Sequence, residues 1–512
     1  MASSVSSHED GVLCGDWKCV KCGERLWSEA LGKCTTANGA LSNDTTNSFC
    51  LDYFFKCRGA DVNELIIKAW NENPLTTLKL MFYIRDCRGG KGEKKLFYDS
   101  FISLYNFSKI TGNDTTITRR INYSLYNNLK HIPEYGSWKD IVKLYESIEN
   151  LDFVSLIKGQ LEMDLKAMNE GKTVSLCAKW LPSASTKLGI KLAKELFVRD
   201  GMASKKYRTI YLTPLRAYIN IVERLMCSRK WDEIDFSKVP SQAMQRLKKA
   251  FKKHTPEKFA AWLKCVIEGK SKVCAKQLFP YQLVGGYERL DDLVEEQWKV
   301  ISNSVKCSLE NTVIVVDTSG SMLARIYNNK EVSNLDIATS LGLLVAENTL
   351  PPFKNTVITF SKKPTLVRLD HQFMFERLCA LRNASWQANT NLQAVFNLII
   401  DELTITKITT APKRIIIISD MQFDSANGKY LTNFEAIKEQ YSSHNLVMPQ
   451  LVFWNVAGAT NDFPAKKNDA GVVLISGFSQ SLLDMVIEDV VSPMNIMKKA
   501  INNPRYDRIT LY

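Results

Sequence analysis

Residues 313–322 read Val313-Ile314-Val315-Val316-Asp317-Thr318-Ser319-Gly320-Ser321-Met322, an apolar run that passes into an Asp-x-Ser-x-Ser loop. The β-branched residues predict a fully buried strand, and Gly320 indicates a tight loop after it. Asp317, Ser319 and Ser321 offer oxygen ligands from this loop, and an open α/β sheet places its binding site at the carboxyl ends of its strands. Oxygen ligands favour Mg²⁺ or Mn²⁺ over zinc. The alternative is a serine-rich turn without a ligand.

The sequence around this loop alternates between strand-like and helical segments. Short β-branched runs lie at 313–316, 356–360, 415–418, 449–453 and 472–475. Helical patterns lie between and after them, at about 334–348, 372–382, 391–403, 431–440 and 478–491. This alternation predicts a doubly wound, mainly parallel α/β sheet, which we place at about residues 304–512.

Further oxygen side chains lie in two other loops of this region. Asp420 directly follows the strand-like run 415–418 and its Ser419, and Thr390 directly precedes a helical stretch. Loops at the carboxyl ends of neighbouring parallel strands meet, so these side chains can converge. The predicted ligands of Mg²⁺ or Mn²⁺ are Asp317, Ser319, Ser321, Thr390 and Asp420. One coordination position would remain for an acidic side chain of a protein partner. In the alternative, Asp420 only caps the next turn, and Asp424 competes for the metal-ligating role.

This set resembles the metal-ion-dependent adhesion site of von Willebrand factor A-type domains, over roughly residues 308–495. The resemblance implies a Rossmann-like α/β domain with a bound divalent cation. One departure lies at 420–422, where many members of that family have Asp-Gly and this chain has Asp-Met-Gln.

No catalytic set accompanies the predicted metal site. The five histidines all lie outside the motif loops, and Gly89–Gly92 lacks the spacing of a phosphate-binding loop. We therefore expect a binding protein and not an enzyme. A metal-dependent phosphoester hydrolase is the weaker alternative, because a metal and water alone can form such a site.

Residues from Leu51 to about Val300 follow a helical pattern, with apolar residues three and four positions apart and short breaks at proline and glycine. Strand-like alternation is nearly absent there. Paired antiparallel helices in a HEAT-like stack fit this pattern, without a strict sequence period. We therefore predict an α-helical repeat module at residues 39–303.

The positive charge of the chain is concentrated in this helical region. The 512 residues are 45% hydrophobic and 24% charged, as in an ordinary globular protein, and carry a formal net charge of +13. Residues 305–512 hold 20 Lys and Arg against 19 Asp and Glu, so nearly all of the excess lies in the first 304 residues. A polyanion is therefore expected to bind to the helical module.

Two basic clusters are candidates for that role. Lysines recur at i and i+4 within 246–276, where each like-charged pair costs about 0.2–0.5 kcal/mol, which a polyanion would offset. A second cluster, at 85–95, is interleaved with aromatic residues whose helical spacing favours a core role. The residues predicted to contact RNA are Arg85, Arg88, Lys91, Lys248, Lys249, Lys252 and Lys253. The alternative is a solvated helix face.

Several short motifs extend the comparison with known families. In order they are Asn38-Gly39-Ala40, Phe82–Gly92, Ile132–Asp140, Ala178–Pro182, Val239–Ser241 and Pro280–Tyr281. Over about residues 36–512 they resemble an uncharacterised family of plants and large DNA viruses, distantly related to the TROVE module of Ro ribonucleoproteins. Ro proteins join a ring of helical repeats to a von Willebrand A domain and bind small structured RNAs. The resemblance implies a TROVE-like helical module and a structured RNA partner.

The N-terminal tail, residues 1–38, contains a possible zinc site. Cys19-x-x-Cys22 has the spacing of zinc ligands, and Cys14 and Cys34 would complete a tetrahedral set in a small zinc ribbon. The alternative is a disordered tail with spare cysteines.

The principal hypothesis is a non-enzymatic RNA- or ribonucleoprotein-binding scaffold. Its helical module would hold phosphates, and its metal site would receive an acidic side chain of a partner. The second hypothesis is a protein-interaction adaptor whose basic surface is incidental. The sequence has no run of 18 apolar residues and no apolar leader, so we expect no membrane partner. We expect a cytoplasmic location, in a host cell or virus particle if the protein is viral.

Overall fold

The structure is a computed structural model, and it describes residues 33–110, 115–149, 151–284, 290–305, 309–326, 332–360, 364–384, 391–405, 412–424, 432–458, 462–486 and 492–511. A helical region comes first and is followed by a six-stranded α/β sheet, which confirms the expected order of the two parts. No helix within the described ranges has the length and apolar character needed to cross a membrane.

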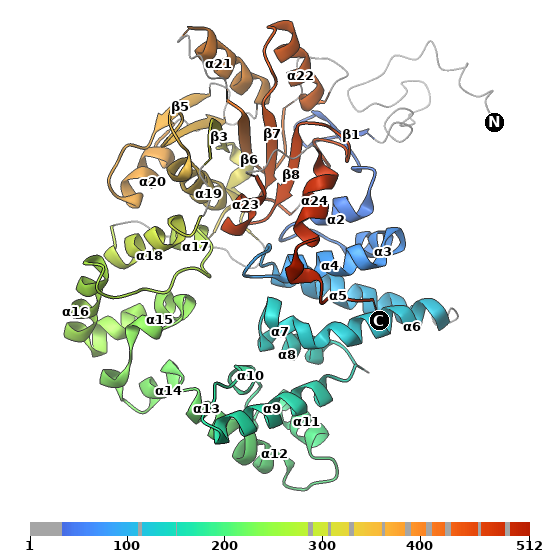
Figure 1. Ribbon diagram of the computed structural model, residues 1–512, viewed down its shortest axis with the longest axis vertical. Coiled ribbons are helices and arrows are strands. Elements are labelled where there is room, and N and C mark those ends of the chain that lie inside the picture. Colours follow the sequence, from blue (N-terminus) through green and yellow to red (C-terminus); the bar gives the residue numbers. More distant parts are fainter. Residues whose placement is uncertain are drawn as a thin grey trace.

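The helical region forms an arc whose two ends both contact the α/β region (Figure 1). Its first half contains α2 (Phe49–Phe55), α3 (Asn63–Glu72), α4 (Pro74–Arg85), α5 (Lys94–Ile110), α6 (Thr115–Asn128), α7 (Ile132–Tyr135), α8 (Trp138–Ser147) and α9 (Phe153–Asn169). Its second half contains α10 (Cys177–Trp180), α11 (Lys187–Leu196), α12 (Ala203–Lys206), α13 (Thr213–Tyr218), α14 (Val222–Cys227), α15 (Ser241–His254), α16 (Pro256–Ile267), α17 (Tyr281–Val284) and α18 (Asp292–Ser302). The first helices contact β8 (Val472–Ser476), and the last ones contact α19 (Asn334–Asn348).

The sheet has the strand order β5-β4-β3-β6-β7-β8. Its strands are β3 (Thr312–Asp317), β4 (Thr356–Phe360), β5 (Thr365–Arg368), β6 (Arg414–Ser419), β7 (Gln450–Asn455) and β8 (Val472–Ser476). All pair in parallel except β5, which pairs antiparallel with β4 at the edge. The predicted β-branched runs therefore all form strands. Strand β5, which is short and half-exposed, was not predicted from the sequence.

Helices cover both faces of the sheet, as parallel strands require. The covering helices are α19 (Asn334–Asn348), α20 (Met374–Arg382), α21 (Leu392–Ile405), α22 (Asn433–Ser443) and α24 (Pro493–Ile501). Val313 and Val315 of β3 pack with residues of α21 and α22, whereas Ile314 and Val316 pack with residues of α19. This alternation explains why β3 is apolar at every position and buried throughout.

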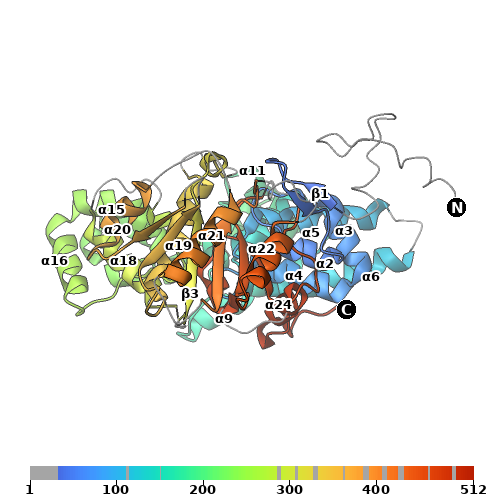
Figure 2. The same cartoon turned by 90° about the horizontal axis from the view of Figure 1, so that it is seen from above.

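The two regions share one hydrophobic core. A single cluster extends from α2–α9 to the face of the sheet that α19 covers, whereas α15 and α16 pack in a separate cluster. Figure 2 shows the sheet between the two ends of the helical arc. The N-terminal strands β1 (Lys33–Thr35) and β2 (Leu41–Asn43) also lie against the α/β region, because Asn43 bridges to Phe463.

Candidate functional site

The ends of strands β3 and β6 bring two carboxylates together. These strands are parallel neighbours with Val316 opposite Ile418, so Asp317 and Ser419 are the next residues along them. The Ser419 hydroxyl donates to Asp317 Oδ2 at 2.6 Å, and Asp420 follows directly. Asp317 is fully buried, and Asp420 is 5% exposed.

Two serine hydroxyls lie in the same place. Ser319 Oγ and Ser321 Oγ are 3.0 Å apart, and the Ser319 backbone N–H donates to Asp317 Oδ1 at 2.9 Å. The Ser321 side chain is also hydrogen-bonded to Asp420. The structure thus brings together Asp317, Ser319, Ser321 and Asp420. Thr390, the remaining predicted ligand, lies outside the described residues.

The electrostatics of this cluster favour a cation. Burial and the neighbouring Asp420 charge raise the pKa of Asp317 to about 7, and burial raises the pKa of Asp420. Neither carboxylate forms an ion pair with a described lysine or arginine. A divalent cation would neutralise both groups and use the hydroxyl oxygens as ligands, so the donor set fits Mg²⁺ or Mn²⁺. The described residues contain no cluster of three or more His, Cys, Asp or Glu suited to a metal, so hydroxyls and water would have to complete the coordination.

Met421, which stands where the Asp-Gly pattern has glycine, adopts a backbone conformation that is typical of glycine. This residue adopts a φ of 66°, in the left-handed region that glycine enters without cost. Its side chain is fully buried and packs with Phe423 in the cluster beneath α21 and α22. The loop after Asp420 therefore has a glycine-like backbone in spite of the methionine.

The loop that contains Asn38-Gly39-Ala40 lies beside the carboxylates, which the sequence analysis did not predict. The Asn38 side-chain amide donates to the Gln422 carbonyl at 2.7 Å, and the Ala37 N–H donates to Gln422 Oε1 at 2.6 Å. Thr36 Oγ1 donates to the Phe423 carbonyl at 2.8 Å. The only signal in the sequence was the motif itself. Its partners lie more than 380 residues away.

Three of the four predicted zinc ligands, Cys14, Cys19 and Cys22, lie outside the described residues. Cys34 is in β1, where burial and the charges of Asp462 and Asp44 raise its pKa to about 12. These surroundings favour the neutral thiol, whereas zinc binds the thiolate.

Two of the predicted RNA-contacting residues are inside the protein, which corrects that expectation. Arg85 is 2% exposed, and its Nη2 lies 2.6 Å from Asp140 Oδ2. Lys91 is fully buried; its ammonium donates to the carbonyls of Phe54 and Lys56 and, at 2.6 Å, to Ser476 Oγ. Neither group can reach a phosphate from there. Arg85 instead joins α4 to α8, and Lys91 joins the end of α2 to β8, so these motifs are determinants of the fold.

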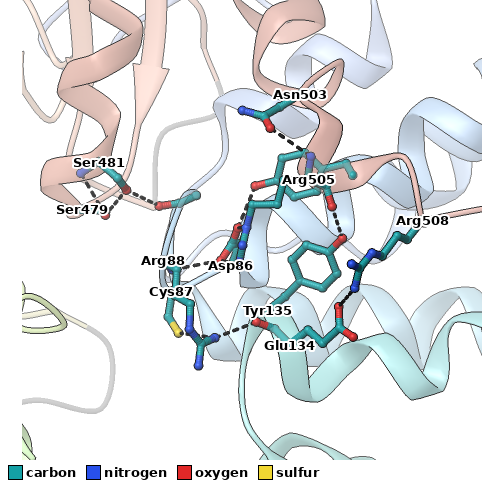
Figure 3. Close-up of polar contacts among 12 residues, drawn as sticks. Asp86, Cys87, Arg88, Glu134, Tyr135, Ser479, Ser481, Asn503, Arg505 and Arg508 are labelled. Atoms are coloured by element: carbon teal, nitrogen blue, oxygen red, sulfur yellow. Dashed lines mark hydrogen bonds and ion pairs between the residues drawn. The ribbon is translucent and has the colours of Figure 1, made fainter.

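Arg88 is exposed and is hydrogen-bonded to a neighbouring helix. Its Nη1 donates to the Glu134 carbonyl at 2.7 Å (Figure 3). On α15, Lys248 pairs with Asp291 at 3.2 Å. The side chains of Lys249, Lys252 and Lys253 are exposed and form no ion pair with the described residues. These last three are the predicted RNA-binding residues that the structure leaves on an open surface.

The opposite face of α15 explains why these lysines point outward. Met244 and Phe251 are buried and pack in the cluster shared with α16. The helix is therefore amphipathic, with one apolar face and one basic face.

Two family models match the chain, one over the helical region and one over the α/β region. The model described as Domain of unknown function (DUF2828) matches residues 36–152 and 153–314, and Domain of unknown function (DUF7788) matches residues 311–504. The uncharacterized protein L728 of Acanthamoeba polyphaga mimivirus is 30% identical over 515 residues, which cover 90% of this chain and 86% of that protein.

Among solved structures, the Ro (RSR) protein of Deinococcus radiodurans matches with a TM-score of 0.36 and 10% identity. The match covers 86% of this chain and 90% of that one. At this score the likeness carries no functional argument. The sequence matches do establish a family: the chain belongs to the DUF2828 family, whose model covers more than half of it, and continues into a DUF7788 region at its α/β sheet.

Proposed function

We propose that this chain is a non-enzymatic RNA-binding scaffold with a divalent-metal-dependent ligand site in its α/β region. The observation that carries RNA binding is the open basic face of α15, formed by Lys249, Lys252 and Lys253. These lysines lie in the part of the chain that holds nearly all of the excess positive charge. RNA phosphates would neutralise them and release counterions.

Further exposed cations continue from this helix. They are Lys264 on α16 and, after that helix, Lys270, Lys272 and Lys276. Of these, Lys270 is paired with Glu268 at 2.7 Å, and the other three add exposed positive charge to the same part of the chain. The order of motifs resembles that of an uncharacterised family distantly related to the TROVE module, and this relation also favours a structured RNA and a HEAT-like helical module.

The proposed metal site rests on the buried pair Asp317 and Asp420 beside two hydroxyls. Two buried carboxylates that form no ion pair with any lysine or arginine of the described residues are costly unless a cation or proton joins them. We infer that Mg²⁺ or Mn²⁺ binds there, in a von Willebrand A-type arrangement, and that a partner's acidic side chain completes its coordination.

The RNA proposal is tested by fluorescence anisotropy with a labelled structured RNA. Lys249→Gln/Lys252→Gln/Lys253→Gln should weaken binding by about ten-fold or more, because three phosphate contacts are lost. The matched control, Lys354→Gln/Lys438→Gln/Lys498→Gln, removes the same charge from exposed positions of the α/β region. The proposal fails if both triple variants bind RNA as the wild type does.

The second candidate function is a protein-interaction adaptor, which the metal cluster would serve by itself. In that case Mg²⁺ or Mn²⁺ would support capture of a protein partner, Asp317→Ala would abolish it, and nuclease would leave it unchanged. RNA binding by α15 would then be absent.

A further inference from the structure

A basic cavity of about 710 Å³ lies in the part of the helical arc farthest from the sheet (Figure 1). It is bounded by the loop before α11, by the π-helical segment Tyr207–Leu212 and by α13. Three cations line it: Lys205, Arg208 and Arg216. Its hydroxyl groups belong to Ser183, Ser185, Ser204, Thr209 and Thr213. No acidic side chain is among these described lining residues.

Arg216 holds a fixed position in this cavity. Its Nε donates to the Ala178 carbonyl and its Nη2 donates to the Leu181 carbonyl, both at 2.8 Å. Its partners are carbonyls, so its positive charge is not neutralised by them. Lys205 and Arg208 are exposed and make no ion pair with the described residues. The cavity thus has uncompensated positive charge and several hydroxyl donors, a combination suited to a phosphate group.

The π-helical segment is a second unusual feature. Such segments are rare and occur frequently at functional sites. Here the segment places Arg208 and Thr209 on the cavity wall.

A neighbouring cavity of about 510 Å³ shares Ser183 and Arg216 with the first. Trp180, which is 38% exposed, forms part of its lining, together with the apolar side chains of Leu181 and Pro240. The ammonium groups of Lys139 and Lys179 lie 5.8 Å and 5.5 Å from the centre of the Trp180 ring. A nucleobase can stack on this indole, with the two lysines beside it to pair with phosphates. The one acidic lining residue, Glu223, is paired with Arg246 at 3.0 Å.

We propose that the two adjoining cavities form a nucleotide site, with the phosphate among Lys205, Arg208 and Arg216 and the base beside Trp180. The nucleotide can be free or can belong to an RNA strand. The second source rests on the proposed RNA-binding function, and the first does not. The second cavity adjoins α15, whose Gln242, Ala243 and Arg246 form part of its lining. The phosphate-binding residues Lys205 and Arg208 lie outside α15, so substitutions there and at Lys249, Lys252 and Lys253 test the two proposals separately.

Isothermal titration calorimetry with the full chain tests the site, using adenosine monophosphate and adenosine as probes. The monophosphate should bind at least about ten-fold more tightly than adenosine, because the phosphate supplies charge-assisted hydrogen bonds. Lys205→Ala/Arg208→Ala should remove that difference, and Trp180→Ala should weaken both probes. Lys438→Ala/Lys498→Ala, on exposed positions of α22 and α24, should leave both affinities unchanged.

A competition measurement identifies the source of the nucleotide. If single-stranded RNA displaces the monophosphate from the wild type, the site takes a nucleotide of a strand; if it does not, the site takes the free nucleotide. The proposal is overturned if the monophosphate and adenosine bind alike, or if Lys205→Ala/Arg208→Ala binds the monophosphate as the wild type does. Circular dichroism of each variant separates loss of the site from loss of the fold.

Discussion

Met421 holds a left-handed backbone conformation directly after Asp420 while its side chain is fully buried. The conformation costs about 1–2 kcal/mol for a residue with a Cβ, and burial of the side chain returns about 1.5–3 kcal/mol. Met421→Ala loses the burial and keeps the strain, whereas Met421→Gly loses the burial and releases the strain.

We therefore expect both variants to be less stable than the wild type, with Met421→Gly more stable than Met421→Ala by about 1 kcal/mol. Denaturant unfolding measures the difference. The usual order, in which alanine is the more stable of the two, would contradict the strain at this position.

Lys91 predicts a specific dependence of stability on pH. Burial lowers the pKa of its ammonium group to about 7, whereas an unfolded lysine has a pKa of about 10.4. Between these values the unfolded state binds more protons than the folded state, so Lys91 makes stability rise with pH. Below about pH 7 the destabilisation caused by burying the Lys91 ammonium group is at its maximum and no longer changes with pH.

The matched comparison is with Lys91→Met. Between about pH 7 and pH 9, the free energy of unfolding of the wild type should rise relative to that of Lys91→Met, by up to about 1.4 kcal/mol per pH unit. Buried thiols and phenols titrate in both proteins, so the difference isolates the lysine. Parallel pH profiles of the two proteins would show that Lys91 keeps its ordinary pKa.

Single residues differ in how far the sequence predicts their roles. Asp317 and Asp420 could be placed together because each follows a β-branched run, and parallel neighbours end at the same edge. Arg85 and Lys91 could not be assigned, because their partners Asp140 and Ser476 are distant in the chain. A basic cluster in a sequence has the same composition whether its cations are buried or exposed.

Strands and helices were predicted well where apolar periodicity is strong. The buried parallel strands have continuous β-branched runs, and the α15 pattern separates an apolar face from a basic one. The region 176–231 is less predictable, because short helices, a π-helical segment and turns follow one another there. Its periodicity breaks with each change of geometry, and the proposed nucleotide site lies among these irregular elements.

The adjacent ends of β3 and β6 give a prediction about metal binding. Mg²⁺ or Mn²⁺ should raise the melting temperature of the wild type, because a cation that binds only the folded state stabilises it. Asp317→Asn should show no such rise. Without metal it should melt above the wild type, because it removes the repulsion between the carboxylates.

Asp424→Asn serves as the control for this experiment, since Asp424 is the competing ligand in the same loop. Differential scanning fluorimetry with and without the metal is sufficient. If the metal still raises the melting temperature of Asp317→Asn but not that of Asp424→Asn, Asp424 and not Asp317 is the metal ligand.

The helical region is hydrogen-bonded to the last residues of the chain. Asp86, directly after α4, accepts hydrogen bonds from the Arg505 guanidinium (Figure 3). It also accepts one from the Tyr506 hydroxyl at 3.0 Å. The Tyr135 hydroxyl donates to the Arg505 carbonyl at 2.5 Å. The sequence predicts a boundary near residue 304, but it does not reveal contacts between segments more than 350 residues apart.

Asp86→Ala should therefore destabilise the whole molecule and not one region. We expect a loss of about 2–4 kcal/mol, because buried, charged hydrogen bonds are broken and Arg505 loses its partner. Asp507→Ala, which removes a largely exposed carboxylate, should cost about 0–1 kcal/mol. Unfolding followed by both far-ultraviolet circular dichroism and tryptophan fluorescence checks this. A loss confined to one of two separate transitions would contradict a shared core.

The salt dependence of RNA binding tests the proposed function most directly. For the structured RNA, each phosphate contact contributes between about −0.7, the value for single strands, and about −0.9, the value for a duplex, to the slope of log affinity against log salt concentration. Lys249→Gln/Lys252→Gln/Lys253→Gln should therefore make the slope shallower by about 2–3 relative to the wild type, whereas Lys354→Gln/Lys438→Gln/Lys498→Gln should keep the wild-type slope. Equal slopes for all three proteins would contradict RNA binding by α15.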